Sequence, residues 1–234
     1  MTRVLVPVEV LEGKTVSPGL MNLLGTVDVT VLGYHVLPEQ TPPDQARLQF
    51  ENRATDALED LSEIFRDAGG DADHRLVFTH EREQTISRTT DEVRARAFAI
   101  PGMAGDAEQL LVALSGDVAT DRILSFVTEL VGDRDIGVTL FLADEHDAAS
   151  DRLDAAAKQL DSAGLDVRTE LATDVSPLEA LVDAAVGHDA IVMGEKAPSF
   201  RSFVFDDETD RVASASFGPV IAVRYDPSLD GERE

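Results

Sequence analysis

The residues best able to do chemistry lie in the stretch 193–212, MGEKAPSFRSFVFDDETDRV. It follows an apolar run, and its glycine, Gly194, stands where a phosphate-binding turn begins in an α/β protein, since backbone N–H groups approach a phosphate closely at a residue without a Cβ. At the start of the next expected helix, where the phosphate would rest, stand Asp206, Asp207 and Glu208. The stretch therefore combines the frame of a nucleotide site with the wrong charge for a phosphate.

The size of the charge effect decides what these acids do. A carboxylate about 4 Å from a phosphate charge costs roughly 1 kcal/mol in water and about 4 kcal/mol at an effective dielectric of 20. A helix dipole returns only about 0.3–1 kcal/mol. We therefore expect the acids to serve as first-turn residues of a helix over 207–216. The alternative is a Mg²⁺ ion that bridges the carboxylates to phosphates, or positive charge from Lys196 and Arg201.

No other group of residues has the spacing of a catalytic or metal site. The stretch Ser115-Gly116-Asp117 lacks the pattern of a nucleophile elbow. His35 stands at an expected strand end, where we expect a hydrogen-bonded structural role, and the pair Asp144-Glu145 is a weak candidate for a hydrated cation. The sequence has no cysteine, which excludes thiolate chemistry. The five histidines have no metal-ligand spacing: His35, His74, His80, His146 and His188.

The composition limits the classes of partner that the chain can bind and indicates the solvent to which it is adapted. The 234 residues carry 45 acids against 20 basic residues, a net charge of −25. Such a chain repels nucleic acids and anionic membranes, and many carboxylates with few lysines are typical of a protein adapted to very high salt, which shortens the reach of self-repulsion. No apolar run is long enough for a membrane span or has the pattern of a signal peptide, so we expect a cytoplasmic protein without membrane insertion.

The elements that must position these residues occur twice. Residues 84–102 and 176–194 align without a gap, each as a helical stretch, a short apolar run and a glycine. Upstream, 29–32 matches 138–141, and the first apolar run of the chain matches 110–114. Strands that alternate with helices predict doubly wound parallel sheets. The sequence therefore predicts two copies of one α/β unit.

The second copy is the longer one. Its last helix, 207–216, and a fifth strand, 219–224, have no counterpart in the first copy, which ends after its fourth strand. We expect Ser176 to cap a helix with Glu179 in a capping box. The other expected strands of the second copy are 109–114, 137–143, 166–172 and 190–193, and its other helices are 119–132, 148–163 and the one that Ser176 caps. The predicted domains are residues 1–105, a truncated unit, and 106–226, a complete unit, followed by an acidic tail at 227–234.

A family resemblance rests on GHDAIVMG at 187–194 and FGPVIAV at 217–223. With two α/β units of this length, the chain resembles the universal stress protein (UspA) family, in its tandem-domain haloarchaeal type, over nearly its whole length in element order. The resemblance implies a Rossmann-like, adenine nucleotide alpha hydrolase-like fold with strand order 3-2-1-4-5 in the second unit. It also implies a ligand crevice at the carboxyl ends of strands 1 and 4, where many members bind ATP and others bind none.

The nucleotide-binding members carry a G-x-x-G turn and, later, a G-[ST] pair. Gly194 matches the first glycine, and Ala197 takes the place of the second. Asp206 and Asp207 fall on the final pair, and Thr209 keeps a small hydroxyl. By this resemblance the phosphate cradle is degenerate in the second copy.

The remaining family positions lie on the strands. Ser115 replaces the aspartate that follows strand 1 in the nucleotide-binding members, and Glu9 stands there in the first copy. Leu142 matches the position that packs on adenine, and Met193 precedes the motif glycine. These are cofactor-binding positions by resemblance. We expect no cofactor, with ATP and Mg²⁺ as the alternative.

The resemblance and the degenerate motif together predict a non-enzymatic stress-response protein that acts through a protein partner or through dimerisation. An ATP-binding switch or slow ATPase in the second unit is one alternative, and a binder of a small uncharged metabolite in the crevice is another. The aromatic cluster 200–205 is a candidate partner surface. The unpaired fifth strand either joins the two copies internally or pairs two chains through Pro219–Tyr225, and we expect the homodimer.

Overall fold

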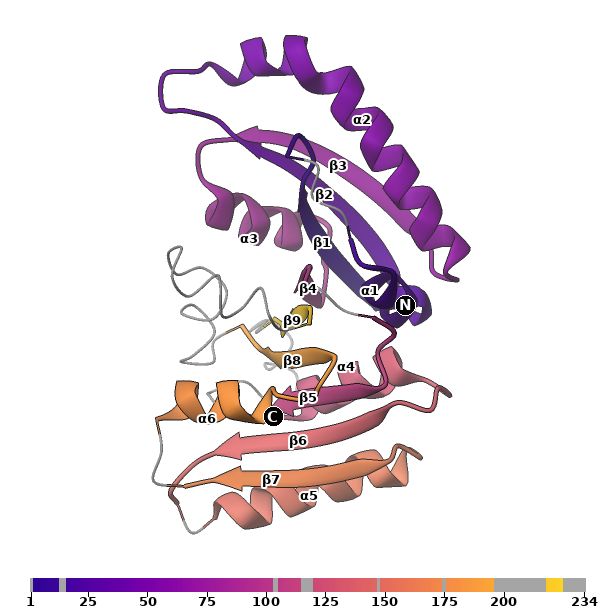
Figure 1. Cartoon of the computed structure of the whole chain (residues 1–234), viewed down its shortest axis with the longest axis vertical. Helices are drawn as coiled ribbons and strands as arrows, with labels where there is room; N and C mark the ends of the chain where they lie inside the picture. Colours follow the sequence, from indigo (N-terminus) through magenta and orange to yellow (C-terminus); the bar gives the residue numbers. More distant parts are fainter. Residues whose placement is uncertain are drawn as a thin grey trace, which may run out of the picture.

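The described residues form a single sheet of nine strands. The computed structural model describes residues 2–12, 16–102, 105–114, 120–146, 148–173, 176–195 and 218–224. The strand order is β3-β2-β1-β4-β9-β8-β5-β6-β7, and Figure 1 shows the outer strands β3 and β7 at opposite ends of the molecule. The strands are β1 (Arg3–Glu9), β2 (Asp28–Val36), β3 (Ala72–Thr79), β4 (Ala97–Ile100), β5 (Gln109–Ala113), β6 (Gly137–Ala143), β7 (Val167–Ala172), β8 (Ala190–Gly194) and β9 (Val220–Val223).

The order within each half confirms the predicted fold class. The first half has the order 3-2-1-4 and the second half the order 3-2-1-4-5, and neighbouring strands within each half are parallel. The inner strands β1, β5 and β8 are apolar on both sides, as strands covered on both faces should be. The two predicted sheets are joined into one, because β9 pairs with β4 of the first half as well as with β8.

The prediction that two chains pair through Pro219–Tyr225 is wrong for the described part of that segment. Val220–Val223 runs antiparallel to Ala97–Ile100 along one edge and parallel to β8 along the other. A β-strand has two hydrogen-bonding edges, and both are used within the chain. The internal pseudo-dimer, the other alternative, is therefore the arrangement that the structure has.

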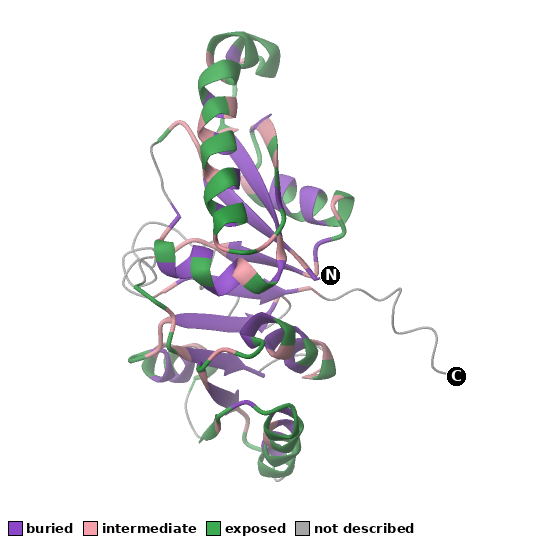
Figure 2. Cartoon of the chain, turned by 90° about the vertical axis from the view of Figure 1, so that its right-hand side faces the viewer, coloured by how far each residue is buried: buried purple, intermediate pink, exposed green. Residues whose placement is uncertain are grey.

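Helices cover both faces of the sheet. The helical elements are α1 (Pro18–Leu23), the 3₁₀ turn η1 (Leu24–Thr26), α2 (Pro43–Asp67), α3 (Arg82–Glu92), α4 (Thr120–Val131), α5 (Ala149–Ser162) and α6 (Pro177–Ala184). Side chains of α1, α2, α4 and α5 share one core cluster with the strands, and those of α3 and α6 share the cluster on the opposite face. Figure 2 shows the buried residues concentrated in the strands and the exposed ones on the outer sides of the helices.

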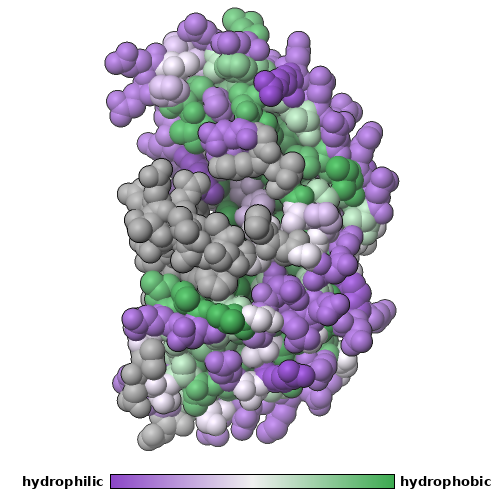
Figure 3. All heavy atoms as spheres, viewed as in Figure 1, coloured by the Kyte–Doolittle hydropathy of each residue, from purple (hydrophilic) through white to green (hydrophobic). Residues whose placement is uncertain are grey.

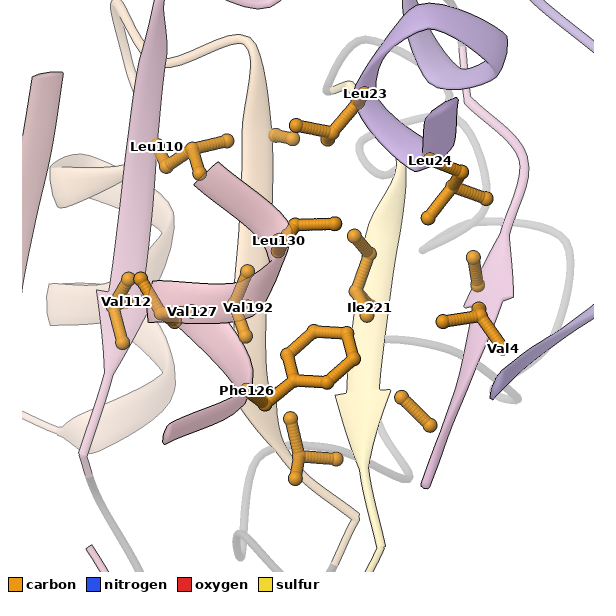
Figure 4. Close-up of a cluster of buried hydrophobic side chains, with 14 of the residues drawn as sticks. Val4, Leu23, Leu24, Leu110, Val112, Phe126, Val127, Leu130, Val192 and Ile221 are labelled. Atoms are coloured by element: carbon orange, nitrogen blue, oxygen red, sulfur yellow. The ribbon is translucent and has the colours of Figure 1, made fainter. Parts of the chain in front are cut away.

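The core is continuous across the two halves. Figure 4 shows Phe126 and Leu130 of α4 beside Ile221 of β9, with Leu23 of α1 and Val4 of β1 in the same cluster. All five side chains are less than 2% exposed. Since burial of such a side chain contributes about 1.5–3 kcal/mol, this shared cluster binds the halves to one another.

Polar contacts reinforce this junction. The Arg134 guanidinium, which follows α4, donates to the carbonyls of Asn22 (2.6 Å) and Leu23 (2.9 Å) at the end of α1. The Thr26 hydroxyl donates to the Leu130 carbonyl (2.8 Å). These donors satisfy carbonyl groups that a helix end leaves without a partner.

Helix ends follow the sequence signals in part. Gly164, beyond the end of α5, has φ +91° and confirms the predicted C-terminal signal. Pro177 opens α6 as expected, but Ser176 makes no capping hydrogen bond through its side chain, so the predicted capping box is wrong.

On the face drawn in Figure 3, hydrophilic residues lie around the outline of the molecule and hydrophobic residues lie between them. Among the described residues, no helix is both long enough and apolar enough to cross a membrane.

Candidate functional site

The candidate site lies where the strand order of the second half reverses. β5 has β6 on one side and β8 on the other, and all three run parallel. Ala113 at the end of β5 is in register with Phe141 and Met193. The helix α4, which connects β5 to β6, and the helix α6, which precedes β8, lie on opposite faces of the sheet. The carboxyl ends of these strands are the usual ligand position in open α/β sheets.

Three of the predicted site residues belong to the described part of the chain. Leu142 and Met193 are 2% and 0% exposed, and each packs in a core cluster on a different face of the sheet. Gly194 ends β8, paired with Val223 of β9. The structure thus brings Met193 and Gly194 to the switch point.

The other predicted positions lie outside the described residues. They are Ser115, Ala197, Asp206, Asp207 and Thr209, and the expected helix 207–216 lies outside as well. The degenerate phosphate cradle therefore stays a prediction from the sequence.

The described charges beside Gly194 form an ion-pair cluster between the halves. Glu195 follows Gly194, and its carboxylate accepts a hydrogen bond from Arg224 Nε (3.2 Å). Arg224 Nη1 also donates to Asp91 of α3, which belongs to the first half. Burial alone lowers the pKa of Arg224, but the hydrogen bond to Asp91 and the charge of Glu195 outweigh it and raise the pKa. This guanidinium is held by two carboxylates.

A second charged cluster lies at the carboxyl end of β6. Asp144 accepts hydrogen bonds from the backbone N–H of His146 (3.0 Å) and from Arg152 Nη1 (3.0 Å), and its carboxylate also contacts the His146 ring. The hydrogen bond to His146 lowers the pKa of Asp144, and the same bond raises the pKa of His146. Sequence reasoning treated Asp144 as a weak cation ligand. The D-x-H spacing and an arginine eight residues from Asp144 were the signals that could have indicated an ion-pair cluster.

The corresponding strand end of the first half is apolar. The His35 ring lies 6.1 Å from the Phe50 ring and 6.4 Å from the Phe78 ring, centroid to centroid. Its Nδ1 atom is buried and has no hydrogen-bond partner in the structure as described, so the expectation of a hydrogen bond there is wrong for this atom. Glu9 ends β1 at the equivalent of the Ser115 position and is partly exposed.

The described residues show no metal centre. Within them, no group of three or more histidine, aspartate or glutamate side chains is arranged to hold an ion.

The strand order 3-2-1-4-5 of the second half belongs to an α/β fold that universal stress proteins share. The structure of a universal stress protein from Archaeoglobus fulgidus DSM 4304 is similar to this chain with a TM-score of 0.65 and 14% identity, over 97% of each chain. The cytoplasmic domain of a prokaryotic cation chloride cotransporter is similar with a TM-score of 0.53 and 10% identity, over 94% of each chain.

These likenesses establish the fold. The match to a further universal stress protein from Archaeoglobus fulgidus spans 49% of this chain and 97% of that protein, at 21% identity. Its TM-score of 0.37 is too low to support an argument. No protein-family model and no curated protein matches the sequence.

Proposed function

We propose that this chain is a regulatory protein of the universal stress type that works by binding a protein partner or by dimerisation, without catalysis. The observation that carries the proposal is the Arg224 cluster. A positive side chain would strengthen the backbone contacts of a nucleotide phosphate beside Gly194, but Arg224, which contacts the next residue, is already bound by Glu195 and Asp91. To recruit it, a phosphate would have to displace two carboxylates.

The sequence adds negative charge at two positions of the family motif. Asp206 and Asp207 stand at the motif positions that family members fill with glycine and serine. Each carboxylate within about 4 Å of a phosphate opposes binding by roughly 1–4 kcal/mol, depending on the local dielectric. Together with Glu195 these acids favour a site that no longer binds ATP.

Two neighbours that match over nearly the whole length bear on the proposal. One is the cytoplasmic domain of a cation chloride cotransporter, so a fold of this extent occurs as one domain of a larger protein. The other is a universal stress protein of the same length range, which supports membership of that family in its tandem-domain form. A stress-response role in a salt-rich cytoplasm agrees with the net charge of −25.

Calorimetric titration with ATP, with and without Mg²⁺, in molar KCl tests the proposal. We expect no binding tighter than about 1 mM for the unmodified chain. The double variant Asp206→Gly with Asp207→Ser removes both carboxylates and should bind measurably. Asp210→Asn, which removes an acid three residues further on, is the control and should not bind. Micromolar binding by the unmodified chain would overturn the proposal in favour of an ATP switch.

A thermal-shift screen of uncharged metabolites tests the other alternative. A neutral ligand escapes the repulsion from the acids, so the crevice itself does not exclude it. We expect no stabilisation by such compounds, and a reproducible shift that grows with the concentration of the compound would favour a metabolite binder.

A further inference from the structure

Within the described part of the chain, both ends of the sheet carry a strand with one unpaired edge. β3 and β7 are the outermost strands, and each has a single neighbour, β2 or β6. On β7, the residues 168–171 are all exposed, so neither a helix nor a loop of the described chain covers this edge. Unpaired edges attract other strands unless the protein blocks them.

The repeat makes the two edges directly comparable. Arg168 of β7 stands where β3 has Asp73, and Glu170 stands where β3 has Arg75. The equivalence rests on the aligned stretches 29–32 and 138–141 and on the register Thr30↔Asp73, Leu32↔Arg75, Thr139↔Arg168 and Phe141↔Glu170. The two edges therefore carry the same pair of charges in opposite order.

On β3 both charges have partners within the chain. Asp73 pairs with Arg3 of β1 (3.4 Å), and Arg75 pairs with Glu92 at the end of α3 (3.6 Å). These pairs reduce the attraction of the β3 edge for another charged strand.

On β7 the corresponding partners are missing. The positions of Arg3 and Glu92 are taken by Gln109 and Ala184, which carry no charge. Among the described residues, neither Arg168 nor Glu170 forms an ion pair. The edge thus presents one positive and one negative group, two residues apart on the same face, without partners in the described chain.

The backbone shows which groups point outward. The carbonyls of Asp166 and Ala172 accept from Val138 N (2.9 Å) and Asp144 N (3.2 Å), so the even-numbered residues of β7 bond to β6. Since successive residues of a strand alternate, the N–H and C=O groups of Val167, Thr169 and Leu171 point away from the sheet.

We propose that β7 pairs antiparallel with β7 of a second copy of this chain, about a two-fold axis at Thr169. In this register the outward groups of Val167, Thr169 and Leu171 bond to those of Leu171, Thr169 and Val167 of the other copy. Arg168 and Glu170 then form non-hydrogen-bonded pairs, in which opposite side chains approach most closely. Each Arg168 faces a Glu170, so that all four charges are paired.

Alternation and charge thus select the same register. When the two-fold axis passes through a residue whose N–H and C=O point outward, every outward N–H and C=O finds a partner in the other copy. When that residue is Thr169, each Arg168 also lies opposite a Glu170. A shift by two residues in either direction would break the pairing of Arg168 with Glu170. The inference specifies the surface for the dimerisation arm of the proposed function and rests on it.

Sedimentation equilibrium in about 1 M KCl, where the Debye length is about 3 Å, tests the proposal. We expect a dimer for the unmodified chain. Arg168→Glu and Glu170→Arg each place like charges opposite one another and should weaken the dimer at least roughly tenfold, a change of about 1.4 kcal/mol. The double variant with both exchanges restores complementarity and should restore the dimer. Asp73→Arg on β3 is the matched control and should leave the dimer unchanged.

Two further measurements keep the test decisive if a charge variant fails to fold. Thr169→Pro removes an outward N–H without touching the bonds to β6, so it should weaken the dimer and keep the circular dichroism of the fold. In the unmodified chain, hydrogen exchange at Val167, Thr169 and Leu171 should slow as concentration rises. A monomer at all concentrations, or a dimer that persists in both single exchanges and in Thr169→Pro, would overturn the proposal. Nucleotide titration is unaffected by either result, so the two proposals fail separately.

Discussion

The two halves of the chain build the same four strands and differ in how each reaches the centre of the sheet. The second half supplies a fifth strand of its own, β9, parallel to β8. The first half has none, and its fourth strand, β4, is completed by the far edge of the same β9 in antiparallel pairing. One strand therefore serves both halves, and the first half depends on the second for its inner edge.

Equivalent positions have also diverged at the carboxyl ends of the strands. His35 in the first half and Asp144 in the second half occupy corresponding places in the repeat. His35 lies between the rings of Phe50 and Phe78, whereas Asp144 binds His146 and Arg152. The comparison teaches that the repeat conserves the frame of the strands and leaves the residues at their ends free to take different roles.

Truncation of Ile221 in the shared strand should have the largest effect. Ile221 is fully buried between the halves, so Ile221→Ala should lower the free energy of unfolding by about 2–5 kcal/mol. Because β9 serves both halves, hydrogen exchange should speed up in β4 and in β8 alike. Leu171→Ala on β7, where the side chain is 39% exposed, is the control and should cost little. Faster exchange in β8 alone would show that the first half does not rely on β9.

The close approach of Gly19 to Gly105, the last residue before the second unit, offers a sharper test of the packing beside the junction. A Cβ on Gly19 would lie 1.6 Å from the Gly105 carbonyl oxygen, whereas a Cβ on Gly105 meets nothing within 4 Å. Gly19→Ala should therefore destabilise the protein by about 1–3 kcal/mol, since backbone must move. Gly105→Ala, the control, should be nearly neutral in urea unfolding. Equal effects of the two would contradict the contact.

Removal of the Arg134 side chain should have a smaller effect. Its guanidinium is about half buried and donates to the carbonyls of Asn22 and Leu23 in the other half. Arg134→Ala should cost about 1 kcal/mol in urea unfolding, because the carbonyls lose charged donors and regain water. Arg53→Ala, on the exposed side of α2, removes the same charge without such contacts and should leave stability unchanged. A matching loss in both variants would assign the effect to net charge.

The smallest expected effect is a pH dependence at the end of β6. The hydrogen bond to Asp144 raises the pKa of His146, so its contribution to stability is present below about pH 6.5 and is lost as the pH rises through the folded-state pKa. The lowered pKa of Asp144 acts in the opposite direction: its contribution is present above about pH 4 and is lost as the pH falls through the lowered value.

An NMR titration of the histidine ring protons measures this coupling. Asp144→Asn should return the pKa of His146 toward about 6.5. Glu145→Gln, the control, removes a weaker influence and should move it less. An unchanged His146 pKa in Asp144→Asn would show that the contact does not form in solution.

Sequence patterns predicted where helices and strands lie in the chain better than they predicted which strands pair and which side chains form hydrogen bonds. β6 begins and ends at the predicted residues, Gly137 and Ala143, because an apolar run covered on both faces is recognisable locally. The sequence left open whether β9 pairs with β4 of the same chain or with a second chain. An apolar strand such as Val220–Val223 fits either neighbour equally well. Ser176 had the right spacing for a capping box, yet the local pattern does not fix where its side chain points.

For the candidate site too, local patterns predicted the strand ends but not the contacts between distant residues. Gly194 was placed at a strand end by its local pattern, and β8 ends there. The cluster of Asp91, Glu195 and Arg224 was not predicted, because α3 and the end of β9 are more than a hundred residues apart and meet only through the antiparallel pairing of the halves.

The position of the shared strand β9 near the end of the sequence also affects the order in which the sheet forms. A chain that is synthesised from its N-terminus completes β1 to β4 long before Val220–Val223 leaves the ribosome. Until then the apolar edge Ala97–Ile100 has no neighbour, and such an edge is prone to pair with other chains. The last strand to be made is the one at the middle of the sheet, so we expect slow closure of the centre, visible in pulse-labelled hydrogen exchange as late protection of β4 relative to β1 and β2.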